Sequence, residues 1–248
     1  MIDLPFDPIK RAQEIEDTVT QGLKRKYHRF RPAPYYGGIA TADAVGCCFL
    51  CAYCWSYFRI LEPAKHGKFY SPEAVADNLF KIVQKKGFKY VRVTGGEPIL
   101  GERSLEHLVR VIYKTLEGNK DLTFILETNG LLLGYYSDFV ERLKISQLSI
   151  RVALKGWERL SFQHITGADK EYFEYPLIGL KRMLEEGLDA WPAVMLDVFG
   201  KEGLDKIKAE LKNMGIDCSV ETEELEKYPY VMDNIDKRGV GLKVRKEF

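Results

Sequence analysis

Strand-like and helix-like segments alternate along most of this chain, and this alternation limits the folds open to it more than any other feature. The expected strands are residues 38–45, 90–94, 122–127, 146–154, 190–198 and 217–220. The expected helices are residues 71–87, 104–116, 135–143, 175–186 and 204–214. Strands joined by helices form parallel sheets with right-handed crossovers. The sequence therefore predicts an α/β fold, a partial (β/α)6 TIM-like barrel of parallel strands with outer helices.

The expected barrel takes up most of the 248 residues, a length that favours one sizeable core. We expect residues 1–37 to form a partly helical, basic N-terminal extension and residues 38–220 to form the barrel. Residues 221–248 are expected to form a charged tail that packs on the barrel. With 46% apolar residues, the composition is that of a folded protein.

Charge and hydropathy give no general reason to expect a membrane or nucleic-acid partner. The 37 Lys and Arg residues nearly cancel the 36 Asp and Glu residues, which leaves a net charge of +1. Residues 1–10 contain two prolines and two aspartates where a secretory signal needs an apolar run. No later segment approaches the length of about 18 uncharged apolar residues that a membrane helix needs. We therefore expect a cytoplasmic protein with no membrane partner.

Four of the five cysteines fall within the eight residues from Cys47 to Cys54. Adjacent thiols in one short loop suit metal ligation in a reducing compartment better than disulfide pairing. Cys47, Cys51 and Cys54 are spaced so that one loop can wrap them around one face of an iron–sulfur cube, which leaves one iron open to a small-molecule ligand. The alternative is a zinc site, which normally takes four protein ligands and would recruit Cys48 or His66.

Two further motifs follow the second and third expected strands. The turn Thr94-Gly95-Gly96-Glu97-Pro98 would expose backbone groups and one carboxylate, and the segment Glu127-Thr128-Asn129-Gly130 ends the next strand. Either motif alone is typical of an ordinary turn. Because the carboxyl ends of parallel strands meet at one edge of a sheet, we expect the cysteine loop and both motifs to face one mouth of the barrel.

A CxxxCxxC loop after the first strand and a GGEP motif after the second resemble the radical S-adenosylmethionine superfamily, over about residues 39–220. The resemblance implies that Cys47, Cys51 and Cys54 hold a 4Fe-4S cluster, whose fourth iron is chelated by the amino and carboxylate groups of S-adenosylmethionine. Further residues match family positions near this cofactor: Tyr53 beside adenine, Gly95, Gly96 and Glu97 at the ammonium, Thr128 and Asn129 beside the methionyl part, and Ser149, Arg151 or Lys155 at the carboxylate.

The resemblance also implies a reaction. A reduced cluster passes one electron into the sulfonium of S-adenosylmethionine, which yields methionine and a 5'-deoxyadenosyl radical that abstracts hydrogen from a substrate. The protein is then an enzyme with two cofactors, and it needs an electron donor such as ferredoxin or flavodoxin. The chain itself would orient the reacting atoms and exclude water and oxygen.

Within the superfamily, the organisation is closest to the small activating enzymes of glycyl-radical proteins. The Glu-Thr-Asn-Gly segment, followed by residues 152–155 and residues 162–167, resembles theirs in order. Those enzymes usually carry Asp-x-Lys where this chain has Ala153-Leu154-Lys155, and a glycine-proline-glycine turn before the cluster that this chain lacks. Glycyl-radical activation is therefore one candidate function, and the expected substrate is a protein or a small molecule.

RNA or a nucleobase precursor is a rival substrate class. The acid-free segment 22–34 interleaves cations with rings: Lys24, Arg25, Lys26, Arg29 and Arg31 with Tyr27, His28 and Phe30. Such interleaving suits phosphate contact and base stacking, whereas the alternative is a solvated N-terminal face. A third interpretation is a non-catalytic iron–sulfur or zinc module, which leaves the GGEP motif without a role.

Other thiol and polar groups are expected to play smaller parts. Cys48 is a bystander, because a thiol one residue from a ligand does not easily reach the same cube without displacing Cys47. Cys218 is a small apolar filler. Asp197 lies on the expected strand 190–198 and is a candidate for the substrate cavity. We expect residues 199–203 and the tail to shape substrate choice.

Overall fold

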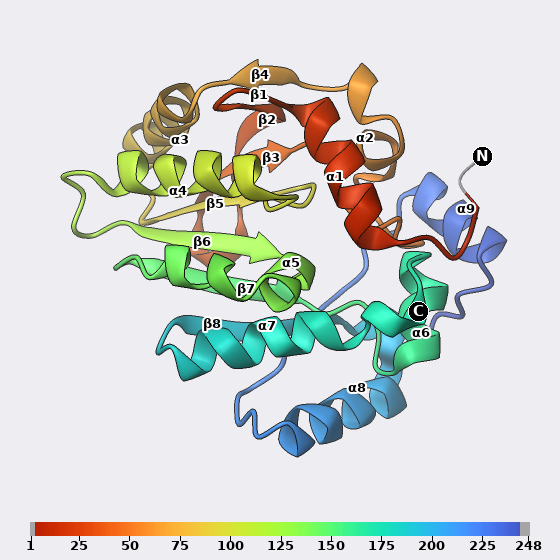
Figure 1. Ribbon diagram of the computed structural model, residues 1–248. Coiled ribbons are helices and arrows are strands. Elements are labelled where there is room, and N and C mark those ends of the chain that lie inside the picture. The colour runs from red at the N-terminus through yellow and green to blue at the C-terminus, as the bar shows by residue number, and fades with distance from the viewer. Residues whose placement is uncertain (1–2, 244–248) are drawn as a thin grey trace.

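The computed structural model describes residues 3–243, and its framework is one curved sheet (Figure 1). Six strands run parallel to their neighbours: β3 (Ile39–Ala44), β5 (Tyr90–Thr94), β6 (Thr123–Thr128), β7 (Leu148–Ala153), β8 (Asp189–Met195) and β9 (Glu221–Glu223). The strands lie side by side in that order, and the sheet does not close on itself. The predicted partial barrel of six parallel strands is confirmed.

Antiparallel strands extend the β3 edge of this sheet. β2 (Lys24–Ala33) pairs with β3, and both β1 (Thr20–Gln21) and β4 (Lys68–Tyr70) pair with β2. The N-terminal segment therefore belongs to the same sheet as the parallel strands. Side chains of β2 share a face with those of β3.

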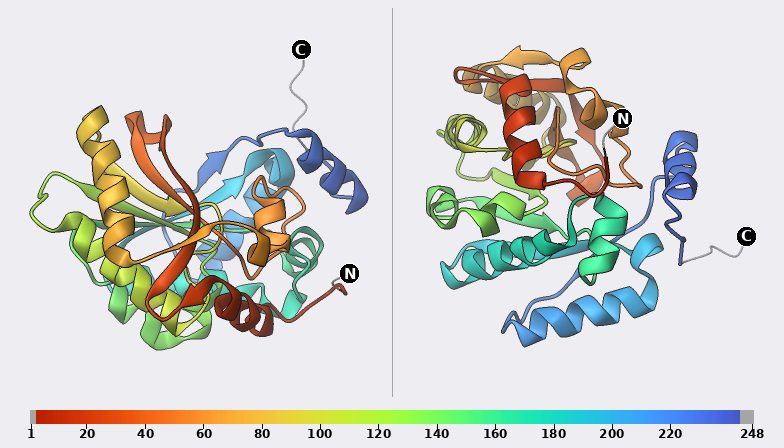
Figure 2. Two further views of the ribbon diagram at one scale, coloured as in Figure 1. Left: turned by 90° about the horizontal axis from the view of Figure 1, so that it is seen from above. Right: turned by 45° about the vertical axis from the view of Figure 1, so that its right-hand side comes forward.

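Helices cover the outer face of the sheet, as Figures 1 and 2 show. They are α3 (Pro72–Lys86), α4 (Glu102–Leu116), α5 (Leu131–Tyr135), α7 (Glu174–Glu185) and α8 (Leu196–Asn213). The remaining helices are α1 (Pro8–Val19), α2 (Tyr57–Leu61), α6 (Arg159–Thr166) and α9 (Pro229–Lys237). Single 3-10 turns lie at Tyr35–Gly37, Pro63–Lys65, Ser137–Phe139, Glu141–Leu143 and Lys170–Tyr172.

The two faces of the sheet differ in polarity, because successive residues of a strand point to opposite sides. The residues that face the helices are apolar and fully buried: Val91, Val93, Phe124, Leu126, Ile150 and Val152. The opposite, inner face carries the polar side chains of Thr41, Arg92, Glu127 and Arg151. Charged groups therefore line the inside of the barrel.

Helix α3 shows how local sequence sets the bounds of an element. The Ser71 hydroxyl accepts a hydrogen bond from the Ala74 backbone N–H at 3.3 Å, and Pro72 takes the first helical position. Gly87 ends the helix with φ of +68°, a left-handed conformation that favours glycine. The start and the end predicted for this helix are both confirmed.

The helix predicted over residues 135–143 is wrong. The helix at this place, α5, begins directly after Gly130, which has φ of +76°, and it ends at Tyr135. Two 3-10 turns follow instead of a continuous helix. Gly134 explains the position of α5, since a Cβ there would lie 1.8 Å from the Tyr175 carbonyl oxygen of α7. Only glycine allows this close packing of the two helices.

The C-terminal third also departs from the prediction. The strand expected over 190–198 ends at Met195, and α8 continues from there through the whole of 199–203 to Asn213. Gly200, with φ of +59°, allows the kink that joins the two halves of α8. The last strand lies at Glu221–Glu223 rather than at 217–220, and helix α6 was not predicted.

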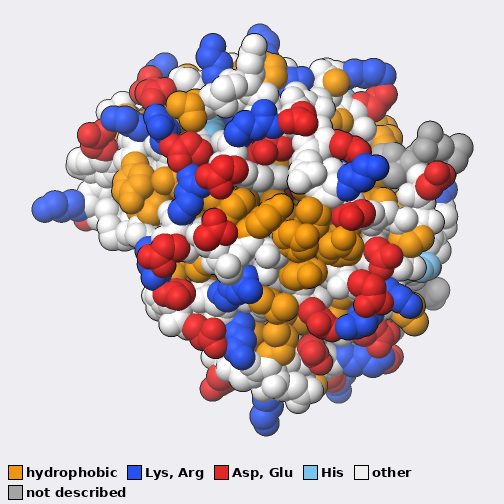
Figure 3. Space-filling view, viewed as in Figure 1, with side chains coloured by type: hydrophobic (Ala, Val, Ile, Leu, Met, Phe, Trp, Pro, Cys, Tyr) orange, Lys and Arg blue, Asp and Glu red, His pale blue; other side chains and the backbone are white. Residues whose placement is uncertain are grey.

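The outer face shown in Figure 3 intersperses acidic and basic side chains, and hydrophobic side chains gather near α5. Tyr135 of α5 is 40% exposed there. Among residues 3–243, no helix has both the length and the apolar composition needed to cross a membrane.

His107 of α4 ties the N-terminal strands to the barrel. Its Nδ1 lies 2.7 Å from the Leu23 carbonyl oxygen, and its Nε2 lies 3.0 Å from the Tyr27 hydroxyl. Because a carbonyl only accepts, Nδ1 carries the hydrogen and Nε2 accepts from Tyr27. Burial lowers the pKa of His107 to about 4, so the ring stays neutral in the folded protein.

We predict that His107 makes the protein less stable in acid. An unfolded chain binds a proton at this histidine near pH 6.5, so stability is lost as the pH falls from about 6.5 toward about 4. His107→Gln removes the titrating group. At pH 7 the variant is expected to have a lower unfolding free energy than the wild type, and this difference should be smaller by about 2 kcal/mol at pH 5. Urea denaturation at both pH values measures it. The exposed His164→Gln is the matched control, and an unchanged deficit contradicts the prediction.

Candidate functional site

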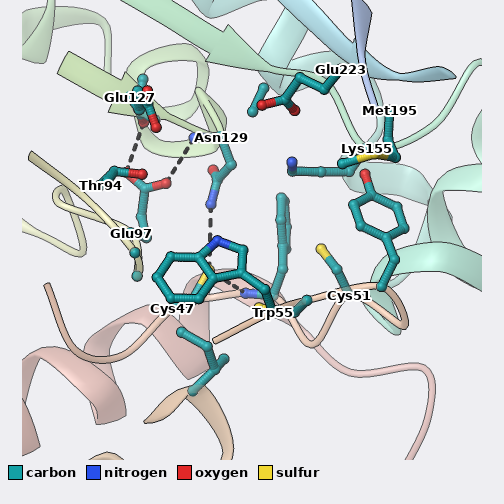
Figure 4. A pocket seen from close by; sticks show the side chains of 18 of the residues that line it. Cys47, Cys51, Trp55, Thr94, Glu97, Glu127, Asn129, Lys155, Met195 and Glu223 are labelled. Atoms are coloured by element: carbon teal, nitrogen blue, oxygen red, sulfur yellow. Dashed lines mark hydrogen bonds between the residues drawn. The ribbon is translucent and has the colours of Figure 1, made fainter. Parts of the chain in front are cut away.

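Most of the predicted site residues surround one pocket at the carboxyl ends of the parallel strands (Figure 4). The segment after β3 contributes Cys47, Phe49, Cys51, Tyr53, Cys54, Trp55 and Ile60 to its lining. The other strands contribute Thr94, Gly95, Gly96, Glu97, Glu127, Thr128, Asn129, Arg151, Ala153, Lys155, Met195 and Glu223. The cysteine loop and the two turn motifs therefore face a single cavity.

The cysteine loop is held by backbone hydrogen bonds to the end of α6. The Leu50 N–H donates to the Thr166 carbonyl and the Ala52 N–H to the Ile165 carbonyl, both at 2.9 Å. The Arg238 guanidinium donates to the Leu50 carbonyl at 3.2 Å. Segments far apart in the sequence thus fix the loop, which keeps its thiols directed at the pocket.

The three spaced thiols are free and differ in their surroundings. Cys51 is 8% exposed, and Cys47 and Cys54 are half-buried. A hydrogen bond from Cys48 lowers the pKa of Cys47 to about 7, whereas burial raises the pKa of Cys51 to about 12. Among residues 3–243, no three His, Cys, Asp or Glu side chains converge as a single metal ion requires. Cys47, Cys51 and Cys54 line one cavity, and cysteine thiolates are the usual ligands of iron–sulfur clusters.

The Gly95-Gly96 turn packs directly on the backbone that precedes the cysteines. The Gly96 N–H donates to the Ala44 carbonyl at 2.9 Å, and the Glu97 N–H donates to the Gly46 carbonyl at 2.8 Å. A Cβ on Gly96 would lie 2.2 Å from the Gly46 oxygen. Glycine is therefore required for the GGEP turn and the cysteine loop to meet.

The Glu97 carboxylate is fully engaged by neighbouring donors. It is 4% exposed and accepts from the Thr128 hydroxyl at 2.7 Å, the Asn129 N–H at 2.7 Å and the Ile99 N–H at 3.1 Å. Burial and the Cys47 thiol raise the pKa of Glu97 to about 8, and the three donors oppose that rise. The carboxylate therefore joins the turn after β5 to the turn after β6. Thr128 takes part in the same link, since its hydroxyl also accepts from the Gly130 N–H at 3.1 Å.

Asn129 is directed at the thiols (Figure 4). Its Oδ1 accepts from the Leu131 N–H at 3.0 Å, which fixes the orientation of the amide. Its Nδ2 then donates to the Cys48 sulfur at 3.1 Å and lies 3.8 Å from the Cys47 sulfur. Asn129 therefore contacts the cysteine loop directly, a role that the sequence did not indicate.

Two polar groups in the pocket have no protein partner within the described part of the chain. The Tyr53 hydroxyl is buried without a hydrogen bond, in a side chain that is 5% exposed. Lys155 extends into the pocket and forms no ion pair among residues 3–243; its Nζ lies 5.5 Å from the centre of the Tyr53 ring. Buried polar groups normally have partners, so the Tyr53 hydroxyl fits a ligand that fills this space, and the half-buried Lys155 ammonium offers that ligand a positive charge.

Ion pairs on the inner face of the sheet lie next to the cysteines and form part of the pocket wall. Arg92 Nη1 lies 2.6 Å from Glu127 Oε1, and Arg151 Nη2 lies 2.7 Å from Glu223 Oε1 and 3.0 Å from Glu221 Oε1. Burial opposes the charge of Arg151, but the carboxylates of Glu223, Glu127 and Glu221 together raise its pKa above the usual value. Ser149 lies outside the pocket, because its hydroxyl donates to Asp189 at 2.6 Å.

Several predicted roles change. Asp197 does not reach the pocket; its Oδ2 accepts from the Leu225 N–H at 2.8 Å and anchors the tail. Trp55, Met195 and Glu223 line the pocket without having been singled out in the sequence. Trp55 directly follows Cys54, and this adjacency was the available signal for it. Glu223 had no such signal, since the strand that carries it was placed elsewhere.

The basic segment 22–34 does not form a continuous exposed surface. Arg25, Lys26 and Tyr27 are 1%, 8% and 2% exposed. Arg25 donates to the Glu97 carbonyl at 3.1 Å, and Lys26 donates to the Ala64 carbonyl at 2.9 Å. Arg25 therefore contacts the GGEP turn, and Lys26 contacts the 3-10 turn at Pro63–Lys65. Both cations are buried and do not contribute to an exposed RNA-binding surface.

An open parallel barrel that gathers three cysteines of one loop at the carboxyl ends of its strands defines a class of enzymes that work with an iron–sulfur cofactor. Comparison with known proteins agrees. Residues 43–214 match the family model described as the Radical SAM superfamily. The chain therefore belongs to the Radical SAM superfamily, whose members bind a 4Fe-4S cluster and S-adenosylmethionine.

Curated relatives include GTP 3',8-cyclases. The chain is 35% identical over 109 residues to a probable GTP 3',8-cyclase of Saccharolobus solfataricus, and these residues make up 44% of this chain and 32% of that protein. It is 28% identical over 170 residues to the GTP 3',8-cyclase of Helicobacter pylori, and these residues make up 65% of this chain and 48% of that protein. The chain thus spans a third to a half of the length of these two relatives.

Solved structures share the fold at low sequence identity. Streptococcus suis SuiB bound to S-adenosylmethionine matches with a TM-score of 0.56 and 15% identity, over 82% of this chain and 42% of that one. Spore photoproduct lyase complexed with dinucleoside spore photoproduct matches with a TM-score of 0.59 and 14% identity, over 89% of this chain and 66% of that one.

We predict that Lys155 contributes to the binding of S-adenosylmethionine, because an unpaired cation in the pocket attracts a carboxylate. Lys155→Met should weaken binding of this cofactor about tenfold, which corresponds to about 1.4 kcal/mol. Equilibrium dialysis on cluster-loaded protein measures the affinity. Lys206→Met on α8, whose lysine pairs with Glu202, is the matched surface control. Equal affinities for the two variants would contradict the assignment.

Proposed function

We propose that this protein holds a 4Fe-4S cluster on Cys47, Cys51 and Cys54 and cleaves S-adenosylmethionine reductively to abstract hydrogen from a polar substrate. The observation that carries the proposal is the single pocket that the three cysteines share with the GGEP turn and with the polar inner face of the barrel. An electron donor such as ferredoxin or flavodoxin would supply the electron. A reducing cytoplasm suits four thiols within eight residues.

When bound, the cluster and S-adenosylmethionine supply a 5'-deoxyadenosyl radical by reductive cleavage of the cofactor. The residues of this chain bind and orient the cofactor. The backbone of Gly95 and Gly96 offers polar groups to the cofactor's ammonium, and Lys155 offers a charge to its carboxylate. The buried Tyr53 hydroxyl offers one hydrogen bond beside the cysteines. Glu97 and Asn129 keep the turns and the cysteine loop in one arrangement.

The inner face supports a polar substrate rather than an apolar one. Arg92, Glu127, Arg151 and Glu223 line or adjoin the space next to the cysteines, and their charges are fixed by mutual ion pairs. Paired charges at fixed positions recognise a substrate that carries hydrogen-bonding groups. The names of the two curated relatives point the same way, since GTP is a polar, charged substrate. Activation of a glycyl-radical protein has no comparable support.

The direct test is anaerobic reconstitution followed by reduction in the presence of S-adenosylmethionine. Wild-type protein is expected to bind about four irons and four sulfides and to release methionine and 5'-deoxyadenosine. Cys51→Ala should lose cleavage at least a hundredfold, because it removes one cluster ligand. Cys218→Ala is the matched control, since Cys218 lies outside the pocket, and it should keep wild-type cleavage.

Two outcomes would contradict the proposal. A wild-type protein that carries a full cluster but cleaves nothing would favour an electron carrier or a scaffold. A protein that retains one zinc ion and no iron would favour a structural zinc module.

A further inference from the structure

Three arginines surround the indole of Trp55 beside the pocket. The guanidinium carbons of Arg59, Arg31 and Arg29 lie 5.7 Å, 5.8 Å and 6.0 Å from the centre of the Trp55 ring system. Arg29 and Arg31 come from β2, and Arg59 comes from α2. A strand and a helix that are separated in the sequence therefore place three positive charges around one aromatic side chain.

One carboxylate compensates these charges in the described part of the chain. Asp43, which is 1% exposed, accepts from Arg29 Nε at 2.6 Å and from Arg31 Nε and Nη2 at 2.9 Å and 3.2 Å. Arg59 has no ion pair among residues 3–243, and its Nη1 is 3.5 Å from the Ser56 hydroxyl. The cluster therefore carries an excess of two positive charges.

Most of the donors in this arginine cluster remain available. A guanidinium has five N–H donors in a planar fork. Asp43 accepts from one nitrogen of Arg29 and from two of Arg31. Within residues 3–243, both Nη groups of Arg29 and Nη1 of Arg31 therefore have no hydrogen-bond partner. Cation–π contact with Trp55 and the buried Asp43 hold the guanidiniums in place, so little ordering is left for a ligand to impose.

Trp55 connects the arginine cluster to the reaction site. It lines the same pocket as Cys47, Cys51, Glu127 and Glu223 (Figure 4). Its carbonyl accepts a hydrogen bond from the Tyr230 hydroxyl of α9, which fixes this part of the loop. A substrate with its reacting carbon in the pocket can therefore extend past Trp55 and place a distant group at the arginines.

We infer that Arg29, Arg31 and Arg59 form a binding site for a phosphate group of the substrate. A phosphate dianion matches the excess of two charges, and its oxygens accept from several guanidinium forks at once. A small phosphorylated molecule, such as a nucleotide, is favoured over a nucleic-acid strand, because the neighbouring cations Arg25 and Lys26 are buried and cannot follow a backbone. This inference rests on the proposed function, since it assigns the site to the substrate of that reaction.

Calorimetric titration of cluster-loaded, unreduced protein saturated with S-adenosylmethionine tests the inference. The probes are adenosine, adenosine monophosphate and a short oligoadenylate RNA, at one low ionic strength. Adenosine monophosphate should bind at least tenfold more tightly than adenosine to the wild type. Arg59→Gln should reduce that difference to about threefold or less, and this change leaves no buried carboxylate unpaired. Arg159→Gln, on the surface of α6 and paired with Glu174, is the matched control and should keep the full difference.

Three results would overturn the inference. Equal binding of adenosine and adenosine monophosphate would show that no phosphate site exists. Equal loss of binding in Arg59→Gln and Arg159→Gln would show that the attraction is a general charge effect. Tighter binding of the oligonucleotide than of the mononucleotide would assign the arginines to RNA. Because the protein is unreduced, these results are independent of cofactor cleavage, and failure of the proposed function would appear only in the cleavage assay.

Discussion

The hydrogen bonds to the Glu97 carboxylate hold together the carboxyl edge of the sheet, and the site depends on them. One side chain accepts from Ile99 after β5, from Thr128 at the end of β6 and from Asn129 directly after it. On the other side, the Gly96 and Glu97 N–H groups fasten the same turn to the backbone that leads into the cysteines. Three successive strand ends therefore form one unit. Loss of this carboxylate would leave three donors without a partner, at a cost of about 1–3 kcal/mol for each one that stays buried.

The second constraint is the polarity of the sheet. Apolar residues at alternate strand positions pack under the helices, and the residues between them bring arginine and glutamate side chains into the barrel interior. Buried charges are costly unless they are paired, and here each pair joins neighbouring or nearby strands. The same pairs stabilise the barrel and give its interior fixed charges.

Local patterns in the sequence were enough to predict most of the barrel and the groups that surround the cysteines. The strand from Tyr90 to Thr94 and the helix caps at Ser71 and Gly87 lie where the local sequence predicts them. The site positions Cys47, Gly96 and Lys155 follow strand ends, and parallel topology brings strand ends together. These features depend on residues close to one another in the chain.

What the sequence did not reveal depends on contacts between distant segments. Glu223 reaches the pocket because β9 pairs with β8, and the three-residue strand has too little local signal to be placed. Asn129 turns toward Cys48 because its own turn fixes the amide. Arg25 and Lys26 are buried although Lys24 and Arg29 of the same basic run are exposed. The arginine cluster brings together Arg29 and Arg31, which lie 26 and 24 positions before Trp55, and Arg59, which lies four positions after it. No periodicity in the sequence indicates this grouping.

The central claim is that this pocket holds the cluster and S-adenosylmethionine in direct contact. Electron–nuclear double resonance on the reduced protein tests it, with S-adenosylmethionine isotopically labelled at its amino nitrogen. The account predicts a hyperfine coupling between the labelled nitrogen and the cluster in the wild type. A wild-type protein with a full cluster and no such coupling would contradict it.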